Sequence, residues 1–184
     1  MAIVTGGPSG IGASAGRLFQ ENGACWAKEL ATSIVTSHEE DVCNLVDTTV
    51  AEHRKLDIMY SNGGVMDNLA VRSILDRTKT ELDKLFEVNV ACTSVAGLAT
   101  HAYAASKYAI LGLVRNLAAE LRKHGIRANC VSPYATLSPE GAVRAALYLA
   151  SDEANYVSGK NLVVDGGCSV VNPTLEKALR ATFT

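Results

Sequence analysis

Short apolar runs alternate with helical patterns along the 184 residues of this chain. The apolar runs stop at glycine, or at Asn and Gly, which is typical of buried strands that end in turns. The segments between them repeat apolar residues every three or four positions, which indicates amphipathic helices. The pattern predicts strands at residues 2–5, 56–60, 127–132 and 161–164. It predicts helices at residues 11–21, 81–90, 103–123 and 142–150, and a further helix that opens at a capping box on Ser37.

Strands that alternate with helices indicate an α/β protein. The fold class we predict is a Rossmann-type, doubly wound parallel sheet with helices on both faces. A chain of this length suits one domain, and the sequence shows no repeat, low-complexity segment or linker. We therefore predict a single domain over residues 1–184.

Composition and charge exclude several classes of protein. The net charge of −2 does not fit a protein that binds nucleic acid or an anionic membrane surface. No apolar run approaches the ~20 residues that a membrane-spanning helix needs, and no basic segment precedes an apolar one at the start of the chain. The five cysteines are scattered and never spaced as Cys-x-x-Cys, so we expect no disulfide framework and no metal site. We predict a cytoplasmic protein.

A glycine-rich loop joins the first predicted strand to the first predicted helix. A pyrophosphate can approach the unpaired N–H groups and the positive end of a helix only where no side chain blocks it. We expect Gly6 to let the chain turn, Gly10 to admit the phosphates and Gly12 to let the helix pack closely on the strand. Ser9 and Ile11 complete the predicted cradle. A tight turn without a ligand is the alternative, but the strand before the loop and the helix after it favour nucleotide binding.

Tyr103 and Lys107 lie four positions apart in the longest predicted helix, so they share one of its faces. A free tyrosine has a pKa near about 10, and a neighbouring ammonium lowers that pKa by favouring the phenolate. Such a tyrosine can take a proton from an alcohol, or give one to a carbonyl oxygen, while a hydride moves at carbon. The alternative is that a surface tyrosine and a surface lysine have this spacing by chance. The glycine-rich loop earlier in the chain makes this alternative the less favoured one.

The order of the motifs resembles that of the short-chain dehydrogenase/reductase family. The glycine loop reads TGxxxGxG, and it is followed by Asn-Gly-Gly, Tyr-x-x-x-Lys, Ser-Pro and Asp-Gly-Gly in that order. The resemblance implies that Tyr103 is the acid/base and that Lys107 binds the nicotinamide ribose. It also implies that Ser94 hydrogen-bonds the substrate oxygen and that Asn89 holds a water in a proton relay.

The resemblance also implies the partners of the site. Several segments are similar to the plant secoisolariciresinol and xanthoxin dehydrogenases, a group that mainly uses NAD and oxidises secondary alcohols. NAD is thus the expected cofactor with NADP left open, the substrate is a small alcohol or ketone, and the chain forms a dimer or tetramer. Beyond the glycine loop and the Tyr-Lys pair, the residues assigned to the cofactor are Asn62, Gly63, Gly64, Pro133, Thr136 and Ser138.

This chain is shorter than the family pattern, and the losses are internal. Only five positions separate Asn89 from Ser94, although the family places a longer stretch there. A parallel crossover needs a dozen or more residues, so we expect missing or shortened strands. Two hypotheses follow: an oxidoreductase that moves a hydride between NAD(P) and a secondary alcohol or ketone, or an inactive or truncated relative that at most binds nucleotide or partner subunits. A methyltransferase is disfavoured because it has no use for the Tyr-Lys pair.

Overall fold

The computed structural model describes residues 1–26, 38–64, 101–134 and 139–170. Its strands are β1 (Ala2–Val4), β2 (Ile58–Tyr60), β3 (Cys130–Pro133) and β4 (Asn161–Val164). Its helices are α1 (Gly10–Glu21), α2 (Glu39–His53), α4 (His101–Leu121) and α5 (Glu140–Ala150), with short 3-10 helices η2 (Arg122–His124) and η3 (Asp152–Ala154). The order of strands and helices is that of the predicted α/β fold, and the predicted helix at residues 81–90 lies outside the described residues.

The strands form two parallel pairs. β1 pairs with β2, with Val4 opposite Tyr60, and β3 pairs with β4, with Ser132 opposite Val163. Within the described ranges, β2 and β3 are not hydrogen-bonded to each other, so the pairs are separate two-stranded sheets. The parallel direction of both pairs agrees with the predicted doubly wound sheet, and residues 65–100, which lie between β2 and α4 in the chain, are outside the described residues.

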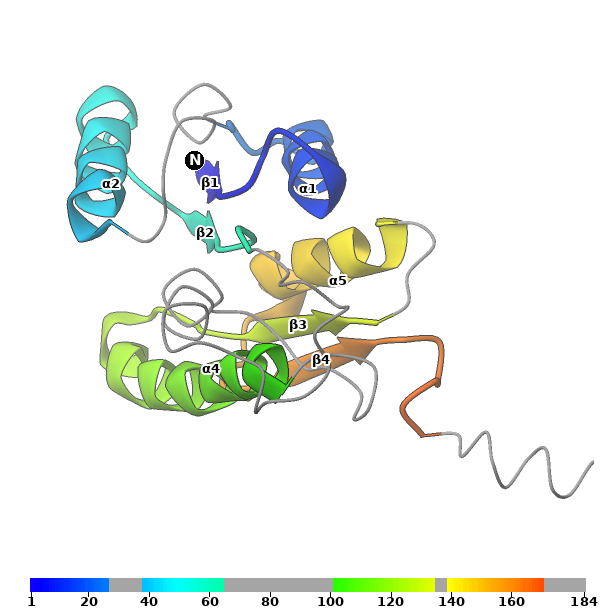
Figure 1. Cartoon of the computed structure of the whole chain (residues 1–184). Coiled ribbons are helices and arrows are strands. Elements are labelled where there is room, and N and C mark those ends of the chain that lie inside the picture. Colours follow the sequence, from blue (N-terminus) through cyan, green and yellow to red (C-terminus); the bar gives the residue numbers. More distant parts are fainter. Residues whose placement is uncertain (27–37, 65–100, 135–138, 171–184) are drawn as a thin grey trace, which may run out of the picture.

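The helices α1 and α5 pack on each other and form the core with the first strand pair. Phe19 of α1 is 1% exposed and lies in one buried cluster with Val143 and Ala146 of α5 and with Ala2 and Val4 of β1. Figure 1 shows α5 lying between the two strand pairs, with α1 and α2 on opposite sides of β1. The helix α5 therefore connects the two sheets through apolar contacts.

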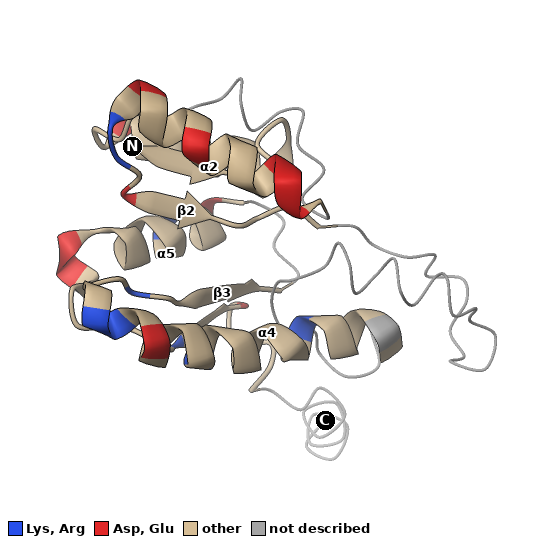
Figure 2. Ribbon diagram, turned by 90° about the vertical axis from the view of Figure 1, so that its left-hand side faces the viewer, with Lys and Arg blue, Asp and Glu red and all other residues tan. Residues whose placement is uncertain are grey.

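Charged side chains are confined to the helices and connections. None of the four strands contains Lys, Arg, Asp or Glu, which is expected for strands covered by helices. The first turn of α2 is acidic, with Glu39 and Glu40 exposed and Asp41 half-buried, and the acidic positions along α2 are red in Figure 2. Negative charge at the N-terminus of a helix is favourable, because the helix dipole is positive there.

The ends of the described elements lie within three residues of the predicted ends, and β4 has the predicted bounds. The N-cap of α2 is His38, one residue after the predicted cap, and Ser37 itself lies outside the described residues. The C-cap of α2 is Arg54, which has a φ of 63°. Gly125 ends η2 after α4 with a φ of +71°, which confirms its predicted role as the residue that terminates this helical stretch.

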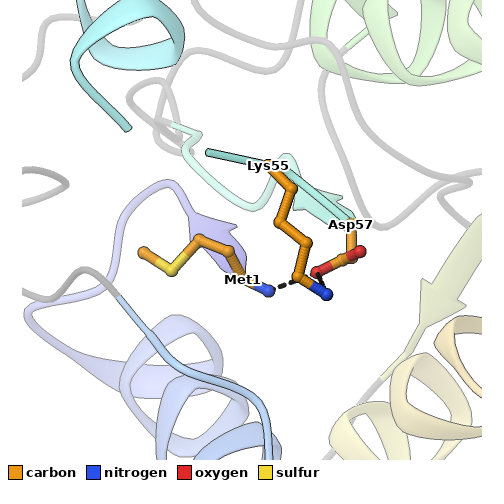
Figure 3. A network of polar contacts seen from close by, with 3 residues as sticks. All are labelled: Met1, Lys55 and Asp57. Atoms are coloured by element: carbon orange, nitrogen blue, oxygen red, sulfur yellow. Dashed lines mark hydrogen bonds and ion pairs between the residues drawn. The ribbon is translucent and has the colours of Figure 1, made fainter. Parts of the chain in front are cut away.

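Asp57 and Arg127, which precede β2 and β3, each make polar contacts with distant parts of the chain. The N-terminal ammonium of Met1 and the side chain of Lys55, at 3.1 Å, both pair with the Asp57 carboxylate (Figure 3). These hydrogen bonds, the first of them from the N-terminal ammonium, lower the pKa of Asp57. Arg127, before β3, donates to the carbonyl oxygens of Leu149 (2.6 Å) and Ser151 (3.2 Å) at the end of α5. The guanidinium thus satisfies carbonyls that the helix leaves unpaired.

Candidate active site

The glycine loop leaves the first helix with an accessible N-terminus. Gly6 and Gly10 have φ values of +65° and +55°, which side chains with a Cβ rarely adopt, and a Cβ on Gly10 would have open space around it. Ser9 is the exposed N-cap of α1, and its side chain makes no capping hydrogen bond. The first turn of α1 contains no acidic residue. Together with Ile11 at the helix start, these residues leave the N-terminus of α1 accessible, and an accessible helix N-terminus is a place where an anion can bind.

A second loop holds the glycine loop in place. The Thr5 hydroxyl accepts hydrogen bonds from the backbone N–H groups of Asn62 (2.9 Å) and Gly63 (3.0 Å). The Asn62 side chain donates to the Thr5 carbonyl at 3.2 Å. The loop after β2 is therefore tied to the end of β1, and the predicted cofactor residues Asn62, Gly63 and Gly64 lie beside the glycine loop. This role of Thr5 was not predicted from the sequence, although the threonine stands at the head of the TGxxxGxG motif.

Gly12 allows the closest backbone approach in the site. A Cβ at Gly12 would lie 2.3 Å from the Gly6 carbonyl oxygen and 2.7 Å from the Asn62 side-chain nitrogen. The prediction that Gly12 permits close packing is consistent with these distances, but the groups it would meet belong to the two loops rather than to the strand. Only glycine can occupy this position without displacing backbone.

Trp26 packs under the glycine loop. A Cβ at Gly16 would lie 2.4 Å from the indole ring, and a Cβ at Gly7 would lie 3.2 Å from its Cζ2 atom. The indole nitrogen is buried and has no hydrogen-bond partner among the residues that the structure describes. This tryptophan was not singled out from the sequence; it is the only one in the chain, so it is a specific optical reporter on the loop.

Tyr103 and Lys107 lie together on α4, as predicted. The Lys107 ammonium is 5.0 Å from the centroid of the Tyr103 ring. Lys107 is only 6% exposed, and burial lowers its pKa from 10.5 to about 8. Ser106, which is also buried, donates from its hydroxyl to the Tyr103 carbonyl at 2.8 Å. A charged group buried beside a phenol at little distance is typical of a functional site.

The glycine loop and the start of α4, the helix that carries Tyr103 and Lys107, lie at the same edge of the sheets. In Figure 1 the arrowheads of β2, β3 and β4 point the same way, and the glycine loop and the first turn of α4 lie on that side. Pro133, the last residue of β3, also lies at this carboxyl edge. In open α/β sheets this edge is where ligands bind. The predicted residues Asn89, Ser94, Thr136 and Ser138 lie outside the described residues.

Metal ligands, cysteines and apolar helices in the described ranges bear on other kinds of site. No group of three His, Cys, Asp or Glu side chains there could hold a metal ion. Cys25, Cys43 and Cys168 are free, whereas Cys130 in β3 is disulfide-bonded, a pairing that the spacing of the cysteines did not predict. None of the helices described is long and apolar enough to cross a membrane.

The comparisons with known proteins show which family the chain belongs to. Residues 90–142 match the family model described as enoyl-(acyl carrier protein) reductase. The chain is 41% identical to (21S)-21-acetoxyl-apo-melianone synthase SDR from Melia azedarach, over 97% of this chain and 92% of the relative. It is 34% identical to secoisolariciresinol dehydrogenase from Forsythia intermedia, over 96% of this chain and 91% of the relative.

A solved structure of similar fold supports the same assignment. A short chain dehydrogenase/reductase family protein superposes with a TM-score of 0.79 at 27% identity, over 92% of this chain and 97% of the other. The alignment with the Melia azedarach relative spans 251 positions, more than the 184 residues of this chain. This chain therefore lacks internal residues that the relative has, as the motif spacing predicted.

Proposed function

The chain belongs to the short-chain dehydrogenase/reductase family of NAD(P)-dependent oxidoreductases, and from this premise we propose that it interconverts a secondary alcohol and a ketone, with Tyr103 as the proton donor and acceptor. The observation that carries the proposal is the burial of the Lys107 ammonium against the Tyr103 ring at 5.0 Å. A buried ammonium costs free energy, so its retention beside a phenol is best explained by a chemical role.

The Tyr-Lys pair handles the proton. In the oxidation direction, the Tyr103 phenolate takes the proton of the substrate hydroxyl while the hydrogen on the same carbon leaves as hydride. In the reduction direction, the phenol returns a proton to the carbonyl oxygen. The Lys107 ammonium favours the phenolate by Coulomb attraction, which is strengthened because water is excluded from this side chain. The nicotinamide ring, when bound, accepts or supplies the hydride.

The cradle binds the dinucleotide. The N–H groups at the start of α1, the positive end of that helix and the open space at Gly10 fit a pyrophosphate. The loop of Asn62, Gly63 and Gly64 supports the cradle through Thr5. We propose NAD as the cofactor on the resemblance to the secoisolariciresinol dehydrogenase group, and a lignan- or terpenoid-like secondary alcohol as the substrate class.

Further predicted residues complete the proposed site. Ser94 is proposed to orient the substrate oxygen and Asn89 to hold a water of the proton relay. Thr136 and Ser138 are proposed to contact the cofactor beyond Pro133. We also propose a cytoplasmic location and a dimer or tetramer, which sedimentation velocity tests directly.

Cofactor binding is tested through the single tryptophan. Excitation of Trp26, which contacts the glycine loop, sensitises bound NADH emission by energy transfer, so titration of NADH gives a binding curve without labels. We expect saturable binding by the wild-type protein and strongly weakened binding by Gly12→Ala. The matched control is Gly112→Ala, whose Cβ meets no atom within 4 Å. No NADH binding by a protein that is folded by circular dichroism contradicts the proposal.

Turnover is tested with secondary alcohols and NAD, by the absorbance of NADH. We expect Tyr103→Phe to abolish turnover and to keep NADH binding. Tyr108→Phe, on the same helix and 57% exposed, is the control and keeps full turnover. Retained turnover in Tyr103→Phe excludes the role proposed for Tyr103. A folded protein that binds NADH without turnover on any alcohol supports the alternative of an inactive relative, which the internal deletions favour.

A further inference from the structure

Ser106 lies between Tyr103 and Lys107 on α4, and its hydroxyl is buried. Ser106 is 1% exposed, and its Oγ donates a hydrogen bond to the Tyr103 carbonyl at 2.8 Å. In an α-helix the N–H of Lys107 donates to the same carbonyl, because each N–H pairs with the carbonyl four positions earlier. The carbonyl oxygen of Tyr103 therefore accepts two hydrogen bonds, one from Ser106 and one from the residue that carries the ammonium.

The helix does not need a hydroxyl at position 106 in order to form. Alanine forms helices better than serine and buries no polar group, and positions 104, 105 and 109 of α4 are alanine. Ile110 and Ala118, which are also buried on this helix, are apolar. A serine hydroxyl that bonds a carbonyl of the preceding turn bends a helix slightly. The hydroxyl of Ser106 is therefore better explained by the geometry that it imposes on its neighbours than by helix formation.

The distance between the ammonium and the phenol depends on the backbone of this turn. Long side chains of a helix lean toward its N-terminus, so Lys107 reaches back over Tyr103, and its Nζ lies 5.0 Å from the ring centroid. The Coulomb attraction that favours a phenolate falls with distance and is stronger where water is excluded. A small rotation of the Tyr103 backbone is magnified at the phenol oxygen, which is the far end of the side chain. A misplacement of about 1 Å can cost about 100-fold in rate.

We propose that Ser106 is a positioning residue for the proton transfer: its buried hydroxyl fixes the backbone of Tyr103 and so sets the distance of the phenol from the Lys107 ammonium. The inference rests on the proposed function, because the proton that moves is that of Tyr103. Ser106 acts through Tyr103 and does not itself contact the substrate or the cofactor. The hydroxyl should therefore affect the rate and its pH profile, and leave cofactor binding unchanged.

The chain contains a matched control for this hydrogen bond. The Ser151 hydroxyl donates to the Tyr148 carbonyl, which is also three positions earlier and also at 2.8 Å. Ser151 is the C-cap of α5 and so lies on a different helix from the Tyr-Lys pair. Ser151→Ala thus removes the same kind of hydrogen bond, from a serine hydroxyl to a tyrosine carbonyl, without touching α4.

Oxidation of a secondary alcohol with NAD compares the variants. We expect Ser106→Ala to lower kcat about tenfold and to leave the KM for NAD unchanged. It should also move the pH of half-maximal kcat upward, because a phenol farther from the ammonium ionises less readily. Ser106→Thr keeps a hydroxyl that can bond a carbonyl of the preceding turn, so it should restore the rate and the pH profile. Ser151→Ala should match the wild type, and a serine with a merely structural role would not move the pH profile.

The ionisation of Tyr103 is also measured directly, so that the result does not depend on turnover. The difference in ultraviolet absorbance between a protein and its Tyr103→Phe variant, followed over pH, isolates this phenol from the other tyrosines. We expect the pKa of Tyr103 to be higher in Ser106→Ala than in the wild type, and unchanged in Ser151→Ala. If Ser106→Ala does not fold by circular dichroism, Ser106→Cys, which keeps the volume and has a weaker donor, takes its place.

The two measurements separate this inference from the proposed function. A wild-type protein that turns over no alcohol refutes the proposed function, whereas a raised Tyr103 pKa in Ser106→Ala still supports the positioning of Tyr103 by Ser106. If the Tyr103 pKa is the same with and without the Ser106 hydroxyl, or if Ser106→Ala and Ser151→Ala have the same kcat and pH profile, the proposal is overturned.

Discussion

Replacing Lys107 by methionine should change the stability of the protein and its catalytic activity in opposite directions. Burial lowers the pKa of Lys107 from 10.5 to about 8, and the side chain is 6% exposed. At 1.36 kcal/mol for each pH unit, a depression of this size corresponds to roughly 3 kcal/mol of folded-state destabilisation at pH 7. Lys107→Met keeps the aliphatic stem and removes the charge. We therefore expect the free energy of unfolding at pH 7 to rise by up to about 3 kcal/mol, while turnover is lost.

The pH dependence of the free energy of unfolding tests whether burial of the Lys107 ammonium causes the destabilisation. The folded state holds the Lys107 proton more weakly than the unfolded state, so the destabilisation is complete below about pH 8. It decreases as the pH rises from 8 towards 10.5, and the stability of the wild-type chain should approach that of Lys107→Met over this window. The assay is urea denaturation followed by circular dichroism at pH 7 and at pH 10. Both proteins are also compared in a Tyr103→Phe background, which removes the phenol from the titration.

The control is Lys123→Met in η2, an exposed lysine whose replacement should change stability by less than about 0.5 kcal/mol at either pH. If Lys107→Met is no more stable than wild type at pH 7, or if the difference between them does not fall with pH, the burial of the ammonium does not cost what the structure indicates. In that case Lys107 would be held by interactions worth as much as its desolvation.

Three further predictions concern backbone and caps. Gly12→Ala should lower the free energy of unfolding by roughly 1–3 kcal/mol, because the new Cβ would lie 2.3 Å from a carbonyl oxygen. Gly112→Ala, which places a Cβ in open space on α4, should raise the free energy of unfolding by about 0.5–1 kcal/mol. Thermal unfolding compares the two variants. Arg54→Gly should stabilise the end of α2 by up to about 1 kcal/mol, since Arg54 has a φ of 63°, and an unchanged or lower melting temperature would contradict this. Arg127→Met should cost about 2 kcal/mol in urea denaturation through the loss of two hydrogen bonds to the end of α5; a neutral effect would show that water replaces the guanidinium.

The sequence predicted the kinds and order of the described elements because each one combines a periodic pattern with a distinct terminator. The turn at Gly6 and the end of the helical stretch at Gly125 were predicted correctly, because glycine is the residue that most readily adopts a positive φ. The pairing of Tyr103 with Lys107 followed from helical spacing alone. These are local properties, which a linear pattern encodes.

The features that sequence analysis missed depend on contacts between distant segments. The Thr5 hydroxyl joins loops that are 57 and 58 positions apart, and neither loop shows by itself that the other will meet it. The alternation of strands and helices predicted parallel strands, but not that α5 would pack against both described strand pairs. The left-handed cap at Arg54 was also missed, since glycine is the usual residue there.

The indole of Trp26 and the bare backbone of Gly16 fill one volume between them. Because a methyl group at position 16 would come within 2.4 Å of the ring, neither site can be varied alone: alanine at 16 collides, and a smaller residue at 26 leaves a void. Exchanging both together, Gly16→Ala with Trp26→Val, should recover much of what each single exchange loses. A directed-evolution library built on this chain should therefore randomise positions 16 and 26 as a single unit.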